Sequence, residues 1–380
     1  MATARPKPIA ESQPTDSVPP ALAIAASYSW RILLVVGALV VVGFLIVQLR
    51  YVVVPVLVAI LISALLLPAV QWLLRHRWPR WLAILTTMFG TIGVISGLVL
   101  VVVWQVRLGF PDLQDKSIAA FERFKEFLLV SPLQLTEADI NGYVSEILAT
   151  LQRDSSVLVS GILSAGSTVG HVIAGMLIAI FATIFILIDG KAIFAWVVRL
   201  FPRRARAAVD GSGHAGWVTL ETFVKVQIFV AAVDATGIGL GAWILGLFFG
   251  GFPLVVPIAV AVFFGSFVPV VGALLTGALA VFVALVYLGP FPALIMLGIV
   301  LLVQQVEGHI LQPLVMGTAV KVHPLAVVLA VAAGGYTAGI AGALFAVPLV
   351  AVTNVVVNYI ASGQWRTNLH PTAEDLLTDG

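Results

Sequence analysis

Residues 253–288, PLVVPIAVAVFFGSFVPVVGALLTGALAVFVALVYL, decide the fold of this chain. The run is largely apolar, and Pro269 and Gly272 interrupt it within residues 267–272. A helix that crosses a bilayer needs about 20 apolar residues, and each half of this run offers roughly 15. Irregular backbone at membrane depth is tolerated only where protein or water satisfies its polar groups. We therefore predict a hairpin of two half-helices that enters and leaves by the same side. Two full crossings are the alternative.

Residues 324–360, PLAVVLAVAAGGYTAGIAGALFAVPLVAVTNVVVNYI, have the same pattern, with an interruption at residues 334–339. We predict a second re-entrant hairpin here. Half-helix ends expose unpaired N–H and C=O groups, and two such tips that meet from opposite faces form a typical transport site. Tight packing of the tips without a ligand is the alternative. The predicted binding residues at the two tips are Pro269, Gly272, Gly335, Thr337 and Gly339.

The composition places the whole chain in a membrane. Of its 380 residues, 61% are hydrophobic and only 10% are charged, and the mean hydropathy is +1.10. Soluble domains contain roughly 25% charged residues. The chain has no cysteine, which excludes disulfides, thiolate metal sites and cysteine nucleophiles. The net charge of +2 is too small to indicate a nucleic-acid partner.

The other apolar runs predict about six transmembrane helices, so we expect an all-α integral membrane protein with two re-entrant helical hairpins. Trp30 should begin the first helix, which is too long for a signal peptide. The predicted spans are 30–49, 52–74, 81–104, 162–188, 219–247 and 291–306. The predicted organisation is a disordered cytoplasmic tail (1–29), three transmembrane helices (30–104), extracytoplasmic amphipathic helices (105–161), a transmembrane helix with a basic cytoplasmic loop (162–218), a transport core with both hairpins (219–360) and a cytoplasmic tail (361–380).

Basic residues set the predicted orientation. One cluster lies between the second and third spans, and another follows the fourth span. The positive-inside rule places both clusters, and with them the amino terminus, in the cytoplasm. The carboxyl tail also returns to the cytoplasm if each hairpin re-emerges where it entered. The clusters are Arg75, Arg77 and Arg80, and Lys191, Arg199, Arg203, Arg204 and Arg206.

Residues 107–154 then face outside, where eight acidic residues stand against five basic ones. Apolar positions recur there with helical spacing, as at Ile118 and Phe121. Thr136 and Asp139 resemble a capping box at the start of a second helix. The pattern predicts an amphipathic pair at the interface or on neighbouring subunits. A plain connector is the alternative.

A polar segment, QQVEGHILQPLVMG at residues 304–317, follows the sixth span. Gly308 would let backbone approach closely, and Pro313 would stop the next helix from continuing unbroken. A break of this kind beside a titratable group fits a substrate site or a hinge.

Glu307 is the titratable group of this segment. A carboxylate at membrane depth costs a few kcal/mol, so it normally faces a cavity or a partner. We interpret Glu307, with Gln304 and Gln305 beside it, as binding a polar substrate or carrying a coupling proton. A Glu307 that caps the break, or pairs with Lys321 or His309, is the structural alternative.

Asp234 is the deepest carboxylate in the chain, and Lys225 lies too far along the helix for an i,i+4 pair. Asp234 therefore needs a cavity or a donor on another helix. We interpret it as the carrier of a proton or sodium ion, or as the acceptor of a structural hydrogen bond from a hairpin tip. Asp189 is interpreted as a helix stop, and His323 as a turn residue at the entrance of the second hairpin.

The carboxyl-terminal half resembles the signature half of the autoinducer-2 exporter family of bacterial membrane proteins. The likeness covers residues 30–360 in helix pattern, and the specific motifs lie within 219–350. Ser266, where the family often has asparagine, and Val226, where glycine is common, depart from the pattern. The matching positions are Asp189, Gly190, Pro269, Gly272, Gln305, Glu307, Pro313, Gly317, His323, Pro324, Gly335, Gly339, Gly342 and Pro348.

This resemblance implies a multi-pass permease of the inner membrane that exports small molecules such as autoinducer-2, a furanone-type diol. It implies sodium–proton exchange in some members, an elevator-like movement of a hairpin-bearing unit, and homo-oligomers, with pentamers suggested. We expect hinge or structural roles for Gly308, Pro313, Gly317, His323, Pro324 and Pro348.

The favoured function is therefore secondary transport by alternating access. An Na⁺(Li⁺)/H⁺ antiporter that uses Glu307 and Asp234 is the close competitor. A non-transporting scaffold that recruits partners through residues 107–154 is the alternative from another class. The sequence has no G-x-x-x-x-G-K-[ST] and no H-E-x-x-H motif, so no enzyme activity, cofactor or metal site is predicted.

Overall fold

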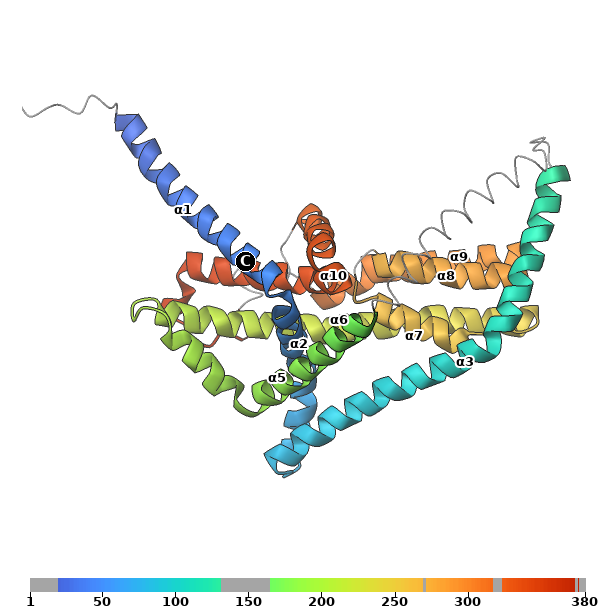
Figure 1. Ribbon diagram of the computed structural model, residues 1–380, viewed down its shortest axis with the longest axis horizontal. Coiled ribbons are helices and arrows are strands. Elements are labelled where there is room, and N and C mark those ends of the chain that lie inside the picture. Colours follow the sequence, from blue (N-terminus) through green and yellow to red (C-terminus); the bar gives the residue numbers. More distant parts are fainter. Residues whose placement is uncertain (1–19, 131–164, 269–270, 317–322, 373–374, 376–380) are drawn as a thin grey trace, which may run out of the picture. The chain divides into compact units, whose positions relative to one another are not determined.

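The computed structural model describes residues 20–130, 165–268, 271–316, 323–372 and 375. All elements within these ranges are helices (Figure 1), which confirms the predicted all-α fold. The chain divides into two compact units, Met1–Arg50 and Tyr51–Gly380. The elements are α1 (Pro20–Gln48), α2 (Arg50–Arg75), α3 (Arg80–Val130), α5 (Ala165–Arg199), α6 (Arg206–Phe249), α7 (Val255–Gly265), α8 (Val271–Leu288), α9 (Pro290–Val306), η1 (Glu307–Met316), α10 (Pro324–Ser362) and η2 (Gln364–Arg366).

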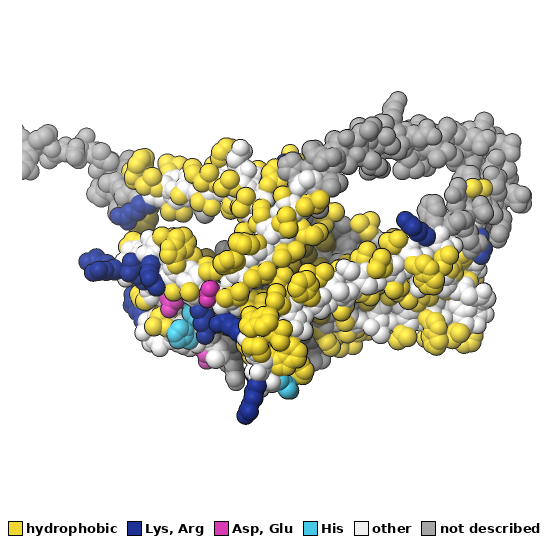
Figure 2. Space-filling view, turned by 60° about the horizontal axis from the view of Figure 1, so that its bottom comes forward, with side chains coloured by type: hydrophobic (Ala, Val, Ile, Leu, Met, Phe, Trp, Pro, Cys, Tyr) yellow, Lys and Arg dark blue, Asp and Glu magenta, His cyan; other side chains and the backbone are white. Residues whose placement is uncertain are grey.

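Among the described residues, seven helical segments are long and apolar enough to cross a membrane. Their outward side chains are largely hydrophobic, and the face in Figure 2 carries few charged side chains, most of them gathered on the left. An apolar surface of this extent is stable in lipid and not in water. The chain is therefore an integral membrane protein. The segments are Tyr28–Gln48, Arg50–Arg75, Arg80–Gly109, Ile173–Arg199, Arg206–Phe249, Pro290–Leu311 and Leu325–Ser362.

The main core joins α6, α7, α8 and α9. Figure 1 shows α8 beside α9, and α7 beside the carboxyl-terminal half of α6. Glycines on α6 let α9 come close, since a Cβ on Gly237 would lie 2.9 Å from a methyl group of Val303. Burial of these apolar side chains against each other holds the four helices as one body. The buried core residues are Ile238, Ala242, Leu245, Phe252, Ile258, Val262, Ala280, Val283, Ala284, Ala293, Met296, Val300 and Val303.

The first hairpin consists of α7, the turn after it and α8. At 11 residues α7 is about 16 Å long, roughly half the thickness of a bilayer core. The two arms meet backbone to backbone, because a Cβ added to Gly272 would overlap the carbonyl oxygen of Gly265. The structure thus turns the chain within the predicted interruption at 267–272. Whether the hairpin re-enters the membrane stays a prediction.

The second hairpin lies within α10. Its backbone leaves the helical conformation at Ala338 and at Gly339, whose φ of +63° favours glycine. Gly334 and Gly342 would be about 12 Å apart along a straight helix. Instead, a Cβ added to Gly334 would overlap the carbonyl oxygen of Gly342. The chain therefore reverses direction at Gly339, within the predicted interruption.

Several helices extend beyond their predicted ends. The first helical segment of α5 ends at Asp189, as predicted, because the backbone leaves the helical conformation there (φ −127°, ψ 23°), but a second segment continues from this kink to Arg199. Helix α6 starts at Arg206, so the basic loop shrinks to residues 200–205. The guanidinium of Arg206 closes this turn by donating to the carbonyls of Phe201 and Arg199 at 3.0 and 2.9 Å. A helix that leaves the membrane keeps its backbone hydrogen bonds, so polar residues alone do not end it.

The amino-terminal helices show the same tendency. Helix α1 begins at Pro20 and not at Trp30. Helix α3 runs through the boundary predicted at residues 104–105 as far as Val130. Tyr287 of α8 donates to the Gly109 carbonyl of α3 at 3.1 Å. The second predicted amphipathic helix, with Thr136 and Asp139, lies outside the described residues.

Candidate functional site

Asp234 of α6 is buried, with only 1% of the residue exposed, in a helix that packs against the first hairpin. Ser266, at the tip of that hairpin, donates its hydroxyl to Asp234 Oδ2 at 3.1 Å. The other oxygen, Oδ1, has no hydrogen-bond partner among the residues that the structure describes. Buried polar atoms without a partner are rare in folded proteins and call for a specific explanation, such as an ion, a water or a proton. The predicted donor on another helix is therefore present, and it comes from a hairpin tip.

A second side chain of α6 holds the same tip residue. Gln227 is 8% exposed, and its Nε2 donates to the Ser266 carbonyl at 2.7 Å. Gln227 and Asp234 are seven residues apart, so they lie on one face of α6, two turns from each other. Between them they bind both the main chain and the side chain of Ser266. We call Gln227, Asp234 and Ser266 the tip clasp.

Ser266 has two acceptors for its single hydroxyl proton. Its Oγ lies 2.9 Å from the Val262 carbonyl and 3.1 Å from Asp234 Oδ2. When the hydroxyl donates to Val262, the contact with Asp234 persists only if the carboxyl group itself carries a proton and donates to Oγ. The clasp thus has one hydrogen-bond arrangement for each protonation state of Asp234.

Glu307 stands opposite Asp234. The contact of Gly241 with Ile299 and of Gly237 with Val303 sets an antiparallel register between α6 and α9. One further turn along each helix brings Asp234 level with Glu307, at the start of η1, which also contacts α6. The structure therefore brings together the two carboxylates that the sequence predicts as ion or substrate ligands.

The predicted break after α9 takes an unexpected form. The helical run does not stop at Pro313: from Glu307 to Met316 it continues as a π-helix, η1. The π-helix is rare and is frequent at functional sites. The expected close approach at Gly308 is wrong, because no heavy atom of the described residues would lie within 4 Å of a Cβ there. Of the neighbouring glutamines, Gln304 is half-buried and Gln305 is exposed.

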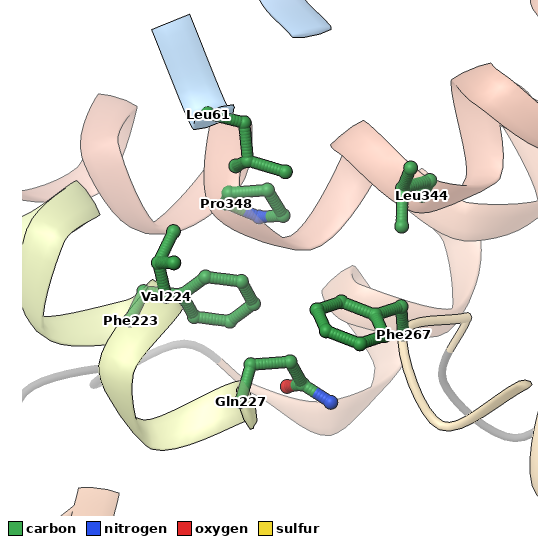
Figure 3. Close-up of a pocket in the computed structure, with 7 residues that line it drawn as sticks. All are labelled: Leu61, Phe223, Val224, Gln227, Phe267, Leu344 and Pro348. Carbon is green, nitrogen blue, oxygen red and sulfur yellow. The ribbon is translucent and has the colours of Figure 1, made fainter. Parts of the chain in front are cut away.

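A small pocket adjoins the tip clasp. It has room for about one water molecule. In Figure 3 Phe223 and Phe267 approach it from opposite sides with the edges of their phenyl rings toward each other, with Gln227 on one side and Pro348 and Leu61 on the other. It lies between α2, α6, the first tip and the second arm of α10. We call it the tip pocket, and its lining residues are Leu61, Phe223, Val224, Gln227, Phe267, Leu344 and Pro348.

The tip of the second hairpin stands apart from this site. Tyr336 is 94% exposed and Ile340 82% exposed, and Thr337 and Gly339 are exposed as well. The Thr337 hydroxyl bonds only to carbonyls of its own helix among the described residues, at Ala333 and Gly334. The structure therefore does not bring the two tips together. The second arm of α10, not its tip, reaches the first hairpin.

The other residues that the sequence predicts as functional cap helices or pack against neighbouring helices. His323 caps α10, since its Nδ1 accepts from the Leu325 N–H at 3.2 Å, and Pro324 takes the first helical position. Pro348 is buried in the tip pocket. Gly335 is helical, with Ala343 Cβ as the nearest atom to an added Cβ at 3.9 Å. The predicted residues outside the described ranges are Pro269, Gly317 and Lys321.

Sequence reasoning missed Gln227 and the phenyl rings of the tip pocket, and for Asp234 it predicted a donor from a hairpin tip without identifying Ser266. One signal for Gln227 was available. It is an amide in an apolar helix, seven residues before Asp234, and so on the same face. Phe223 and Phe267 carry no such signal, because aromatic residues are common in every span of this chain.

Comparison with known proteins identifies similar sequences that are described as transport proteins. Residues 32–362 match the sequence profile described as AI-2E family transporter. A Mycobacterium tuberculosis protein named "Putative transport protein MT0215" is 36% identical over 363 residues, which cover 96% of this chain and 98% of that protein.

Two more distant relatives cover most of the chain. "Putative transport protein YrrI" of Bacillus subtilis is 29% identical over 80% of this chain and 85% of its own length. "AI-2 transport protein TqsA" of Escherichia coli is 22% identical over 82% of this chain and 87% of its own length. These names record transport, and one of them names a solute.

Proposed function

Since the chain belongs to the AI-2E transporter family, we propose that it is a secondary transporter that exports a small organic solute by alternating access. The chain is a multi-pass membrane transport protein. We also propose that the protein lies in the inner membrane with both termini in the cytoplasm, because basic residues cluster in the loops that this orientation places inside.

The observation that carries the proposal is the tip clasp. A transporter needs an element that can change position at a polar site within the membrane. The first hairpin has a short arm, α7, and its tip is attached to α6 through the single residue Ser266 by two buried side chains. Release of these two hydrogen bonds would leave the hairpin held to α6 by apolar packing, which has no fixed hydrogen-bond geometry. We propose that the hairpin moves in this way during transport.

The first solute to test is autoinducer-2, because the Escherichia coli relative is named an AI-2 transport protein. We propose outward movement of the solute and an elevator-like displacement of the hairpin-bearing helices α6 to α9. We also propose that the protein works as a homo-oligomer, with a pentamer as the form suggested by the family resemblance.

A second candidate function is Na⁺(Li⁺)/H⁺ antiport. Buried Asp234, whose Oδ1 has no hydrogen-bond partner within the described part of the chain, favours this candidate, with Glu307 level with it across α6 and α9. A buried carboxylate that lacks a partner normally serves an ion or proton pathway in membrane proteins. Coupling of solute export to the same proton would combine the two candidates in one cycle.

Purified protein in proteoliposomes tests both candidates. Autoinducer-2 added outside inverted proteoliposomes, whose outer face is the cytoplasmic face, should accumulate inside them only when active protein is present, and we compare this uptake with and without a pH or sodium gradient. Cation-driven proton movement without any organic solute would favour antiport. The absence of every flux with correctly folded protein would refute transport and leave the scaffold alternative.

A further inference from the structure

The corner between α2 and α3 gathers tryptophan and arginine side chains at its surface. Three of the nine tryptophans of the chain lie within residues 72–81, WLLRHRWPRW, and three arginines lie among them. Trp72 is 60% exposed, Trp78 39% and Trp81 62%. We call residues 72–81 the basic corner, and Figure 1 shows it at the bottom of the view, where the blue of α2 passes into the cyan of α3.

The tryptophans indicate the depth of the basic corner in the membrane. Two segments that are apolar enough to cross a membrane flank it, since one ends at Arg75 and the next begins at Arg80. Exposed tryptophan is typical of the membrane–water interface, where its ring lies among the lipid headgroups. Arg75 and Arg77 are exposed beside these rings. Their guanidinium groups therefore lie at the level of the lipid phosphates.

These two arginines have no counter-charge of their own. Neither guanidinium makes a hydrogen bond or an ion pair within the described part of the chain. The sequence has no acidic residue between Asp16 and Asp112, so α2 and the membrane-spanning part of α3 carry none. Arginine offers phosphate two parallel N–H donors as well as its charge. The basic corner thus favours an anionic partner with phosphate oxygens.

Arg77 holds a backbone conformation that favours glycine, with a φ of +64°. Its N–H donates to the Leu74 carbonyl at 3.0 Å, and the Trp78 N–H donates to the Leu73 carbonyl at 3.3 Å. This pair of bonds ends many helices, and the residue in the left-handed conformation is then usually glycine. The stability of the turn therefore does not account for an arginine here, whereas a function of its side chain does.

The basic corner is held in place by its neighbours. Arg80, its third arginine, donates to the Leu187 carbonyl of α5 at 3.3 Å. Asp189, two residues further along α5, forms no ion pair with a described arginine. A surface fixed before binding loses little conformational entropy when it binds a ligand. A second core packs α2, α3 and α5 together, and its buried residues are Leu66, Val70, Ala83, Ile84, Met88 and Leu187.

We infer that the basic corner binds the headgroup of an anionic phospholipid, with its phosphate on Arg75 and Arg77. Exposed apolar side chains continue from the corner along both helices, as at Leu74 of α2 and Phe89 of α3. They give the acyl chains a surface to lie against, which a free phosphate ion does not need. The inference goes beyond the proposed transport function and does not depend on it.

The test uses the full chain in micelles of an uncharged detergent, to which phosphatidylglycerol or phosphatidylcholine is added. Bound lipid raises the melting temperature (Tm), so the shift in Tm reports binding. We expect phosphatidylglycerol to reach half of its maximal shift at a mole fraction at least about fivefold lower than phosphatidylcholine, because each arginine near anionic lipid contributes about fivefold in affinity.

Arg77→Gly should lower this preference about fivefold, while its Tm without lipid should equal or exceed that of the wild type, because glycine suits the turn. Arg75→Gln leaves the backbone of the turn unchanged and should cause a similar loss. Arg203→Gly is the matched control, since it removes the same charge from an exposed turn outside the basic corner. It should keep the preference of the wild type.

Equal half-maximal mole fractions for the two lipids, or the same loss in Arg203→Gly as in Arg77→Gly, would overturn the inference. Loss of the phosphatidylglycerol shift when inorganic phosphate replaces chloride at constant ionic strength would overturn it in favour of a free anion. A shift with polyglutamate but no preference for phosphatidylglycerol would overturn it in favour of an acidic protein segment.

Discussion

Asp234 accepts a hydrogen bond of 3.1 Å from Ser266, which lies in the turn after α7, and the second oxygen of its carboxylate has no partner among the described residues. Gln227 binds the main chain of the same serine. A buried acid is thus linked directly to the tip of a hairpin. The charge of Asp234 is therefore coupled to the attachment of the first hairpin to α6.

Replacement of Asp234 by asparagine should abolish ion-coupled flux, with a loss of at least about tenfold, because the side chain keeps its shape and an acceptor oxygen but can no longer exchange a proton. Flux in proteoliposomes under an imposed pH gradient is the measurement. Glu221→Gln is the control, since Glu221 lies on the same helix and pairs with Lys225 at 2.7 Å. Full gradient-driven flux in Asp234→Asn would exclude Asp234 as the carrier.

Ser266→Ala should destabilise the protein by about 1–3 kcal/mol, because it leaves a buried carboxylate without a described partner. The comparison is Ser212→Ala, a buried serine of α6 whose hydroxyl bonds to the Val209 carbonyl of its own helix. Denaturant unfolding of both variants in mild detergent gives the difference. In an Asp234→Asn background the cost of Ser266→Ala should fall; two strictly additive effects would mean that the two residues are not coupled.

Gly272→Ala should prevent the first hairpin from closing, because the added methyl would overlap the Gly265 carbonyl. A loss of about 3 kcal/mol or more, or failure to accumulate in the membrane, is expected. Gly298→Ala on α9 has open space around the added methyl and should be neutral or stabilising by up to about 1 kcal/mol. Similar melting temperatures for the two variants would contradict the described contact.

The second hairpin allows an even closer comparison. Gly334→Ala should disrupt the reversal of α10, since its methyl would overlap the Gly342 carbonyl, whereas the methyl of Gly335→Ala meets only Ala343 at 3.9 Å. Limited proteolysis of each variant in membranes should show faster cleavage near residue 339 in the first variant alone. Equal cleavage would argue for a continuous α10.

A single cysteine at Val268 tests re-entry of the first hairpin into the membrane. The chain has no cysteine of its own, so no background substitution is needed. We expect a small charged thiol reagent to modify this cysteine slowly, and from the same side as a cysteine at Phe291, the exposed residue at the start of α9. Fast modification from the opposite side would establish two full crossings instead.

Local chemistry made the two interruptions predictable. Proline and glycine at the first break, and three closely spaced glycines at the second, oppose a continuous helix whatever surrounds them. The need of Asp234 for a donor on another helix was predictable for a similar reason, because no residue of its own helix lies in reach. These inferences depend on a few neighbouring residues only.

The pairing of helices was not predictable from one sequence. The contacts of Gly237 with Val303 and of Gln227 with Ser266 join residues far apart in the chain. In a soluble protein, polar faces indicate which side of a helix is buried, but most faces here are apolar and give no such signal. The π-helix at Glu307 and the tip pocket depend on this packing and were missed with it.

At the contacts of Gly265 with Gly272 and of Gly334 with Gly342, the two arms of each hairpin meet backbone to backbone. Sliding of one arm along the other would require interdigitated side chains that can exchange partners, and these are missing at the two contacts. Each pair of arms must therefore travel as a rigid body. Any opening for a passing molecule has to form along the outer boundary of a hairpin, where Phe267 and Pro348 meet the rest of the protein.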